Sequence, residues 1–283
     1  MEMLTPATVR GLLDEHGIHP KKSLGQHFLA DPNTARRVAA LAEVERGDRV
    51  LEVGPGLGSL TLALAERGAR VLAVEVDPRL ASLLESVLAG AGVVPGTVDV
   101  RVADAMTVDW PGVLAGASTW SCVSNLPYNV AVPVVIRLLE SAPAVSRIVV
   151  MVQREVGERL AAAPGHREYG AVSVKVAYHA EVSLLGTVPP SVFVPRPKVE
   201  SALVGLRRRT APPVSVPSEA ALFELVRSGF AQRRKMLRRS LQPVLGTHAT
   251  DVLAAAHVPP TARAESLGLD DWAAVARSAA AAA

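Results

Sequence analysis

The sequence of 283 residues contains a single cysteine, few aromatic side chains and no long uninterrupted apolar run. One cysteine, Cys122, excludes an intrachain disulfide and any zinc site built from several cysteines. No run approaches the ~18 consecutive apolar residues that a membrane-spanning helix needs. The N-terminal segment also lacks the continuous apolar stretch of a secretory signal. We therefore expect a cytoplasmic protein without a membrane partner, in which Cys122 is a small buried hydrophobic residue.

The excess of positive over negative charge is also small, because the formal net charge is only +3. Such a small excess does not identify a nucleic-acid partner, so the distribution of the cations must decide. Hydrophobic residues make up 49% of the chain although aromatic residues make up only 4%, so alanine, valine and leucine must fill the core. The length allows one large domain, or a large domain and a small one.

Short β-rich runs alternate with helical patterns from about residue 47 onward. Seven segments have the composition of strands: 48–54, 69–77, 97–104, 120–125, 145–153, 171–178 and 199–209. Helical patterns occupy the intervals at 58–68, from Pro78, and at 132–141 and 155–162. This alternation predicts an α/β fold with a doubly wound, mostly parallel sheet and helices on both faces. Ligands bind such sheets beyond the carboxyl ends of the strands.

Three prolines interrupt both periodicities within 210–217, which we interpret as a linker. Beyond this segment the pattern is entirely helical. We therefore expect a first domain over residues 1–209 and a small all-helical domain over 218–283.

Gly54, Gly56 and Gly58 follow the strand predicted at 48–54 and lead into a helix. Glycine lets the backbone turn sharply and lets a bulky ligand approach the main chain closely. The spacing is G-x-G-x-G, with Ser59 where the dinucleotide fingerprint has its last glycine. By itself, such a turn also fits tight packing of a strand against a helix.

Polar residues end the next three predicted strands: Glu75, Asp104 and Asn125. Glu75 follows the first glycine by about twenty residues, where a carboxylate can accept both hydroxyls of a ribose. Asp104 could accept a hydrogen bond from an adenine amine, although a surface aspartate would give the same pattern. Because the carboxyl ends of parallel strands line one crevice, the glycine loop and these three residues together predict a nucleoside cofactor site.

The segment SNLPYN, residues 124–129, follows directly and carries Asn125, Pro127 and Tyr128. The Asn125 side-chain oxygen and the Pro127 carbonyl could each accept one N–H of an adenine amine, and so stabilise its attack on an electrophile. Tyr128 would stack on the ring, and Phe193 could close the other face. The expected substrate is a flipped or single-stranded adenine, and a sulfonium methyl donor needs no metal. The alternatives are an ordinary strand-to-turn junction and, for Phe193, a core aromatic.

Six segments resemble one known family. They are KKSLGQHFL at 21–29, EVGPGLGSLT at 52–61, VEVD at 74–77, NLPYN at 125–129, FVPRPKVES at 193–201 and FAQRRKMLRRSL at 230–241. Together, and in this order, they are similar to the KsgA-type small-subunit ribosomal RNA adenine dimethyltransferases. The resemblance implies a class I methyltransferase fold and S-adenosylmethionine as cofactor. It also implies transfer of two methyl groups to N6 of each of two adjacent adenosines near the 3′ end of 16S rRNA, in the assembling 30S subunit.

The same resemblance assigns cofactor contacts to six residues: His27, Leu29, Gly54, Glu75, Asp104 and Asn125. His27 stands where many members have asparagine, so the alternative is a half-buried histidine that only packs the N-terminal arm, residues 21–29. Arg239 also replaces an expected asparagine, which affects only an RNA contact.

Cations concentrate within 227–241, which we interpret as a basic helix. The predicted RNA contacts there are Arg227, Arg233, Arg234, Lys235, Arg238 and Arg239, and Lys21 and Lys22 extend them. Few acids offset these charges, which favours contact with phosphates over a merely solvated helix face. A monomer is expected because no further apolar stripe is evident.

Three other functions remain open. A 23S rRNA adenine dimethyltransferase of the resistance type would share the catalytic segment, but the segments at 21–29 and 232–241 argue against it. A DNA adenine methyltransferase more often has proline directly after the asparagine or aspartate, where this chain has Leu126. A ribosome-assembly factor whose methylation is incidental is the third.

Overall fold

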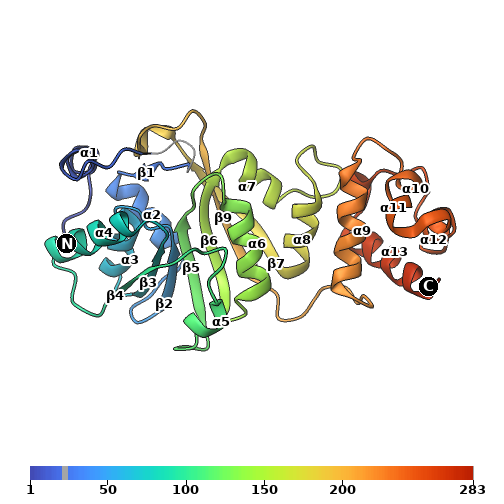
Figure 1. Ribbon diagram of the computed structural model, residues 1–283, viewed down its shortest axis with the longest axis horizontal. Coiled ribbons are helices and arrows are strands. Elements are labelled where there is room, and N and C mark those ends of the chain that lie inside the picture. Colours follow the sequence, from blue (N-terminus) through green and yellow to red (C-terminus); the bar gives the residue numbers. More distant parts are fainter. Residues whose placement is uncertain (21–24, 283) are drawn as a thin grey trace. The chain divides into compact units, whose positions relative to one another are not determined.

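The computed structural model describes residues 1–20 and 25–282, and these residues form two compact units (Figure 1). The first unit comprises Met1–Gly157 and Ser183–Arg208, and the second comprises Glu158–Val182 and Arg209–Ala283. Lys21 and Lys22, two of the predicted RNA contacts, lie outside the described residues. None of the helices in the described ranges has the length and apolar character needed to cross a membrane.

Within the described residues the main sheet has seven strands in the order β4-β3-β2-β5-β6-β9-β7. Their bounds, in chain order, are Arg49–Val53 (β2), Arg70–Glu75 (β3), Val98–Val102 (β4), Trp120–Asn125 (β5), Val145–Gln153 (β6), Ala180–Val188 (β7) and Ser201–Arg208 (β9). The neighbours β4, β3, β2, β5 and β6 pair in parallel, and β9 pairs antiparallel with β6. The predicted doubly wound, mostly parallel sheet is thus confirmed.

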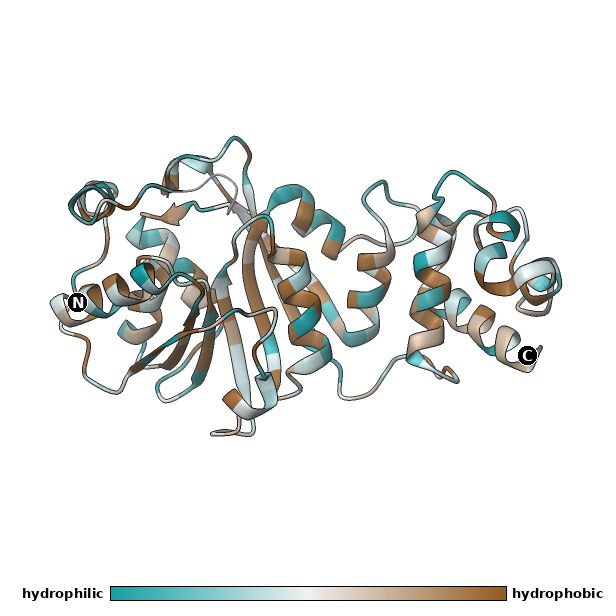
Figure 2. Cartoon of the chain, viewed as in Figure 1, coloured by the Kyte–Doolittle hydropathy of each residue, from teal (hydrophilic) through white to brown (hydrophobic). Residues whose placement is uncertain are grey.

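Strands β2 and β3 are buried along almost their whole length, as parallel strands covered on both faces must be, and hydrophobic residues occupy much of the sheet (Figure 2). The helices of this unit are Pro6–Glu15 (α1), Pro32–Leu41 (α2), Ser59–Glu66 (α3), Pro78–Gly90 (α4), Trp110–Val113 (α5), Ala131–Ser141 (α6) and the start of Arg154–Leu160 (α7). Two short strands, Phe28–Leu29 (β1) and Phe193–Val194 (β8), pair antiparallel as a separate sheet.

Helices α1, α2 and α4 begin with the same local device, a capping side chain followed by proline. Asp31 accepts a hydrogen bond from the Thr34 N–H at 2.7 Å, and Asp77 accepts one from the Arg79 N–H at 2.9 Å. Proline at the first helical position has no N–H to satisfy and already has a helical φ. The sequence thus determines locally where these helices begin, and for α2 and α4 this also limits how far the preceding strands extend.

One predicted strand, 171–178, is wrong, because this segment is helix α8, Ala171–His179. Its alternating apolar residues suggested a strand. However, the Ser173 hydroxyl accepts from the Gly170 N–H at 3.1 Å and donates to the Arg159 carbonyl at 2.6 Å, which satisfies groups at the helix start. Val174 and Tyr178, one turn apart, both lie in the core of the second unit. The strand at this point is β7, which follows directly.

Among the described residues of the second unit, the regular elements are helices apart from the first residues of β7. Besides α8 its helices are Glu219–Ala231 (α9), Leu237–Ser240 (α10), Gln242–Leu245 (α11), Ala249–Ala255 (α12) and Leu269–Ala281 (α13). Phe223 on α9 and Trp272 on α13 are buried at its centre. The unit begins earlier than the boundary expected at residue 218, since the Tyr178 and Phe223 rings pack edge to face 5.3 Å apart.

The basic segment 227–241 is not one helix, contrary to our interpretation. Helix α9 ends at Ala231 and α10 begins at Leu237, with a turn between them in which the Lys235 N–H donates to the Gln232 carbonyl at 2.7 Å. The Leu237 N–H instead donates to the Ala262 carbonyl at 2.8 Å, and the Leu237 side chain is fully buried. Burial of Leu237 in the core therefore accompanies a break between α9 and α10, where the sequence pattern suggested one continuous helix.

Candidate active site

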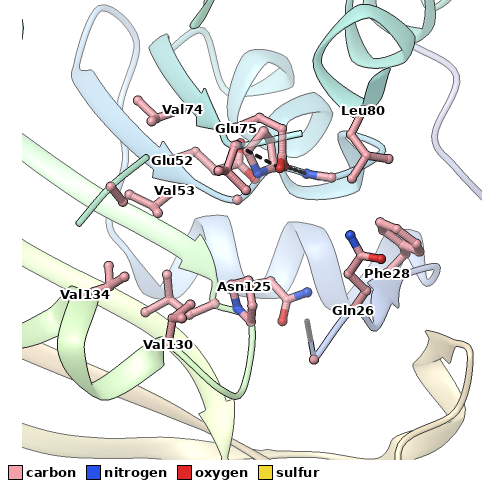
Figure 3. A pocket seen from close by; sticks show the side chains of 18 of the residues that line it. Gln26, Phe28, Glu52, Val53, Val74, Glu75, Leu80, Asn125, Val130 and Val134 are labelled. Atoms are coloured by element: carbon pink, nitrogen blue, oxygen red, sulfur yellow. Dashed lines mark hydrogen bonds between the residues drawn. The ribbon is translucent and has the colours of Figure 1, made fainter. Parts of the chain in front are cut away.

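A pocket lies beyond the carboxyl ends of β2, β3, β4 and β5, where the fold predicts a ligand (Figure 3). Nine of the predicted site residues line it: His27, Leu29, Gly54, Gly56, Glu75, Asp104, Asn125, Pro127 and Tyr128. In Figure 3, Glu75 lies on one side of this hollow, with Asn125 and Gln26 on the other. The four strand ends identified from the sequence thus meet in one place.

The glycine loop has positive φ at Gly54, Gly56 and Gly58, with values of 69°, 57° and 93°. A Cβ at Gly56 would lie 2.9 Å from the Phe28 ring, and one at Gly54 would lie 3.3 Å from Pro127. Gly58 does not line the pocket; it precedes α3, and its Cβ would overlap the buried Leu84 side chain. Gly54 and Gly56 therefore shape the cradle, while Gly58 lets the loop pack against α4.

Ser59, which departs from the dinucleotide fingerprint, has a clear structural partner. Its hydroxyl donates a short hydrogen bond to the Leu29 carbonyl. Leu29 belongs to the N-terminal arm, so this bond joins the arm to the glycine loop that it faces. The side chain that replaces the last glycine therefore helps to close one wall of the pocket.

The Glu75 carboxylate is held at the end of β3 by three backbone donors. The Gly56 N–H donates to one oxygen at 3.2 Å, and the Val76 and Asp77 N–H groups donate to the other at 2.9 and 3.1 Å. Burial raises the pKa of Glu75, and the three donors oppose that rise. Glu75 as a residue is only 6% exposed, and lone pairs of its oxygens remain for the hydroxyls of a ribose.

Asp104 stands just beyond β4 and is also oriented by the backbone. Its Oδ1 accepts a hydrogen bond from the Met106 N–H at 2.8 Å. Ala103, Ala105 and Met106 line the pocket beside it. An acceptor flanked by small and apolar side chains suits a flat, amine-bearing ring.

Asn125 ends β5 and its side chain is tied to the arm. The Nδ2 group donates to the His27 carbonyl at 3.1 Å, so the Oδ1 atom is the acceptor that remains available. Pro127 and Tyr128 follow on the same wall. The amide oxygen is thus oriented by a contact from a segment almost one hundred residues earlier in the chain.

His27 and Tyr128 form a second link, between the N-terminal arm and the loop that follows β5. Their ring centroids lie 5.2 Å apart, and the His27 Nδ1 donates to the Pro195 carbonyl at 2.7 Å. The Tyr128 hydroxyl shares a 2.8 Å hydrogen bond with the Ser201 hydroxyl. A Cβ on Gly25 would lie 2.9 Å from the Tyr128 backbone nitrogen, so the N-terminal arm is in close contact with the loop that follows β5.

Phe193 does not line the pocket. It pairs with Leu29 in the small β1–β8 sheet, is 3% exposed and belongs to the hydrophobic core of the first unit. The alternative of a core aromatic therefore describes it, and we leave it out of the proposed site.

Sequence reasoning missed Glu52, a carboxyl that is 1% exposed and lines the pocket. The Thr61 hydroxyl donates to it at 2.7 Å, and burial raises the pKa of Glu52 to about 8. An acid inside the apolar run of β2 was the available signal. Gln26 and Phe28, which also line the pocket, gave no such signal, because only tertiary contacts bring the arm there.

The predicted RNA contacts of the second unit fall into two kinds. Five are exposed, and their side chains make no hydrogen bond or ion pair with any described residue: Arg227, Arg234, Lys235, Arg238 and Arg239. Arg233 differs, because its guanidinium pairs with Glu265 at 2.8 Å and donates to the Arg167 carbonyl at 2.6 Å. The five cations are available to an anionic partner, and Arg233 supports the fold of this unit.

Comparisons with known proteins identify the family. The family described as ribosomal RNA adenine dimethylase matches residues 18–281. Ribosomal RNA small subunit methyltransferase A of Cutibacterium acnes is 45% identical, covering 96% of this chain and 93% of that protein. The protein of the same name from Thermobifida fusca is 48% identical, covering 97% of this chain and 95% of its own length.

Solved structures agree with this assignment. The 23S rRNA methyltransferase ErmE is 27% identical with a TM-score of 0.67, over 89% of this chain and 98% of its own. A dimethyladenosine transferase from Plasmodium falciparum, 23% identical with a TM-score of 0.74 over 88% of this chain and 96% of its own, has the same fold. The chain therefore belongs to the ribosomal RNA adenine dimethylase family, and is an S-adenosylmethionine-dependent methyltransferase.

Proposed function

We propose that this protein transfers methyl groups from S-adenosylmethionine to N6 of two adjacent adenosines near the 3′ end of 16S rRNA, and dimethylates each of them in the assembling 30S subunit. The family match and the small-subunit names of relatives that are 45 and 48% identical support this substrate. The observation that carries the chemistry is the available Asn125 Oδ1 beside Pro127 and Tyr128, in the same pocket as Glu75 and Asp104.

The donor occupies the cradle at the strand ends. Gly54 and Gly56 allow its close approach, Glu75 accepts the ribose hydroxyls and Asp104 accepts from the adenine amine. His27 and Leu29 cover it from the arm. When bound, S-adenosylmethionine supplies an electrophilic methyl on sulfur, which the protein needs only to align with the attacking nitrogen.

The target adenine leaves its stack and lies against Tyr128. The Asn125 Oδ1 and the Pro127 carbonyl accept its amine hydrogens, which favours a pyramidal nitrogen with its lone pair directed at the methyl group. Acceptors placed for this geometry stabilise the transition state more than the planar ground state. Because the His27 carbonyl already holds the Asn125 amide group in place, the Asn125 side chain loses little conformational entropy when the base binds.

The helical unit holds the RNA. The five exposed cations without partners, together with Lys21 and Lys22, contact phosphates, so affinity falls steeply with added salt. The protein acts as a monomer, and its substrate places this action in the cytoplasm. A 23S substrate is less well supported, because ErmE shares only 27% identity with this chain.

The test is incubation of the protein and labelled S-adenosylmethionine with undermethylated small subunits, followed by mass spectrometry of the modified nucleotides. Dimethylated adenosines near the 3′ end of 16S rRNA are expected. Label in 23S rRNA or DNA, with the small subunit unmodified, would overturn the proposal.

An Asn125→Ala variant separates catalysis from a binding role in ribosome assembly. We expect methyl transfer to fall by about 10²–10³-fold, as when one oriented transition-state partner is removed. Binding of small subunits should be retained. Assembly that depends on the protein but proceeds normally with this variant would favour the assembly-factor role.

A further inference from the structure

The loop at residues 195–200 joins β8 to β9, and both of its ends contact side chains of the pocket. At its start, the Pro195 carbonyl accepts the hydrogen bond from the His27 ring. Just after its end, Ser201 bonds the Tyr128 hydroxyl. The rings of His27 and Tyr128 lie 5.2 Å apart. These two hydrogen bonds therefore hold the loop close to Tyr128, on which the target base is proposed to stack.

The loop is also restrained within itself. Pro195 and Pro197 limit its backbone, and Pro197 is buried. Near its end, the Glu200 carbonyl accepts a hydrogen bond from the Arg154 N–H at 3.0 Å, and the Glu200 carboxylate pairs with the Arg154 guanidinium at 3.0 Å. A ligand that binds this loop therefore meets a segment that is already ordered.

Arg196 and Lys198 project from this restrained loop on either side of the buried Pro197. Both are exposed, and neither makes a hydrogen bond or ion pair with any described residue. The acidic residue that follows them, Glu200, already forms an ion pair with Arg154. Two neighbouring cations without an acidic partner repel each other mildly, and an anion bound between them would relieve this repulsion.

We propose that Arg196 and Lys198 bind the backbone phosphates that flank the target adenosine, and so form an RNA contact of the catalytic unit itself. This inference rests on the proposed function. A flipped base needs its own backbone held near the pocket. The loop is joined by hydrogen bonds to Tyr128, on which the base is proposed to stack, and to His27 beside it. Arginine can bind a phosphate through two N–H groups, and lysine contributes a point charge.

The variants Arg196→Gln and Lys198→Gln test this, with Arg70→Gln as the matched control. Arg70 is an exposed cation whose side chain has no partner among the described residues, at the amino end of β3, opposite the pocket. Affinity for undermethylated small subunits is measured from about 50 to about 200 mM salt. Each loop variant should bind about fivefold more weakly near 0.1 M salt, with a salt slope smaller by about 0.7–0.9. Arg70→Gln should match the wild type.

Calorimetric binding of S-adenosylhomocysteine should be the same in all four proteins, which shows that the pocket is intact. Loop variants that bind the small subunit with the wild-type affinity and slope would overturn the inference. The proposed function fails separately, if the wild-type protein leaves small-subunit adenosines unmodified.

Discussion

The hydroxyl oxygens of Tyr128 and Ser201 lie 2.8 Å apart, although 73 residues separate them along the chain. Ser201 is fully buried at the first position of β9, and burial raises the pKa of the Tyr128 hydroxyl. A buried serine at the start of β9 therefore fixes the ring on which the target adenine is proposed to stack.

Loss of this bond should affect catalysis more than donor binding. We expect Tyr128→Phe and Ser201→Ala each to lower kcat by about fivefold, the equivalent of one hydrogen bond of about 1 kcal/mol. The double variant should be no worse than either single variant, since both remove the same bond. Kinetics with small subunits, together with S-adenosylhomocysteine affinity, measure this. Effects that multiply in the double variant would show that Ser201 acts on the strand rather than through Tyr128.

Gly58 should tolerate a side chain poorly, and Gly90 should accept one. With φ at 93° and Leu84 in the way, Gly58→Ala should lower the free energy of unfolding by about 2 kcal/mol or more. Gly90 lies in the last turn of α4 with nothing near its missing Cβ, so Gly90→Ala should stabilise by up to about 1 kcal/mol. Denaturant titrations of both variants check the contrast, and equal effects would contradict it.

The buried Glu52 should make the stability depend on pH. Its pKa is near 4.5 when unfolded and about 8 when folded, so between these values the folded protein holds a proton that the unfolded chain has lost. Stability should therefore fall as pH rises from about 4.5 to about 8, by an amount on the order of a few kcal/mol, and level off above that.

Glu52→Gln, which can still accept the Thr61 hydrogen bond, should remove this dependence. The variant should gain stability relative to the wild type at the upper end of this pH range and gain little at the lower end. Free energies of unfolding at both ends measure it. A constant difference between the two proteins would mean that Glu52 does not hold the proton.

Arg233 and Arg234 should separate stability from RNA binding, although they are adjacent. Arg233→Ala removes the Glu265 pair and the bond to the Arg167 carbonyl, and should lower the stability of the helical unit by about 1 kcal/mol. Arg234→Ala removes an exposed cation and should leave stability unchanged while it weakens RNA binding. Thermal unfolding and a salt-dependent binding assay distinguish them, and the reverse outcome would reassign the two roles.

The sequence by itself determined the parts of the site that come from strand ends. Gly54, Gly56, Glu75, Asp104 and Asn125 were predictable because each follows a short apolar run, and the carboxyl ends of parallel strands must meet. The positive φ of the glycines and the capping of α4 by Asp77 are likewise local, because they depend on residue type and on the immediate neighbours along the chain.

Only the tertiary structure decided which side chains arrive from elsewhere. Glu52 and Gln26 line the pocket, Phe193 lies in the core, and Arg233 pairs with Glu265, because contacts between residues far apart in sequence place them there. The same holds for 171–179, where burial of Val174 and Tyr178 one turn apart overrides a strand-like alternation. Periodicity reports which faces are apolar, whereas the partner that covers each face depends on the packing of the whole chain.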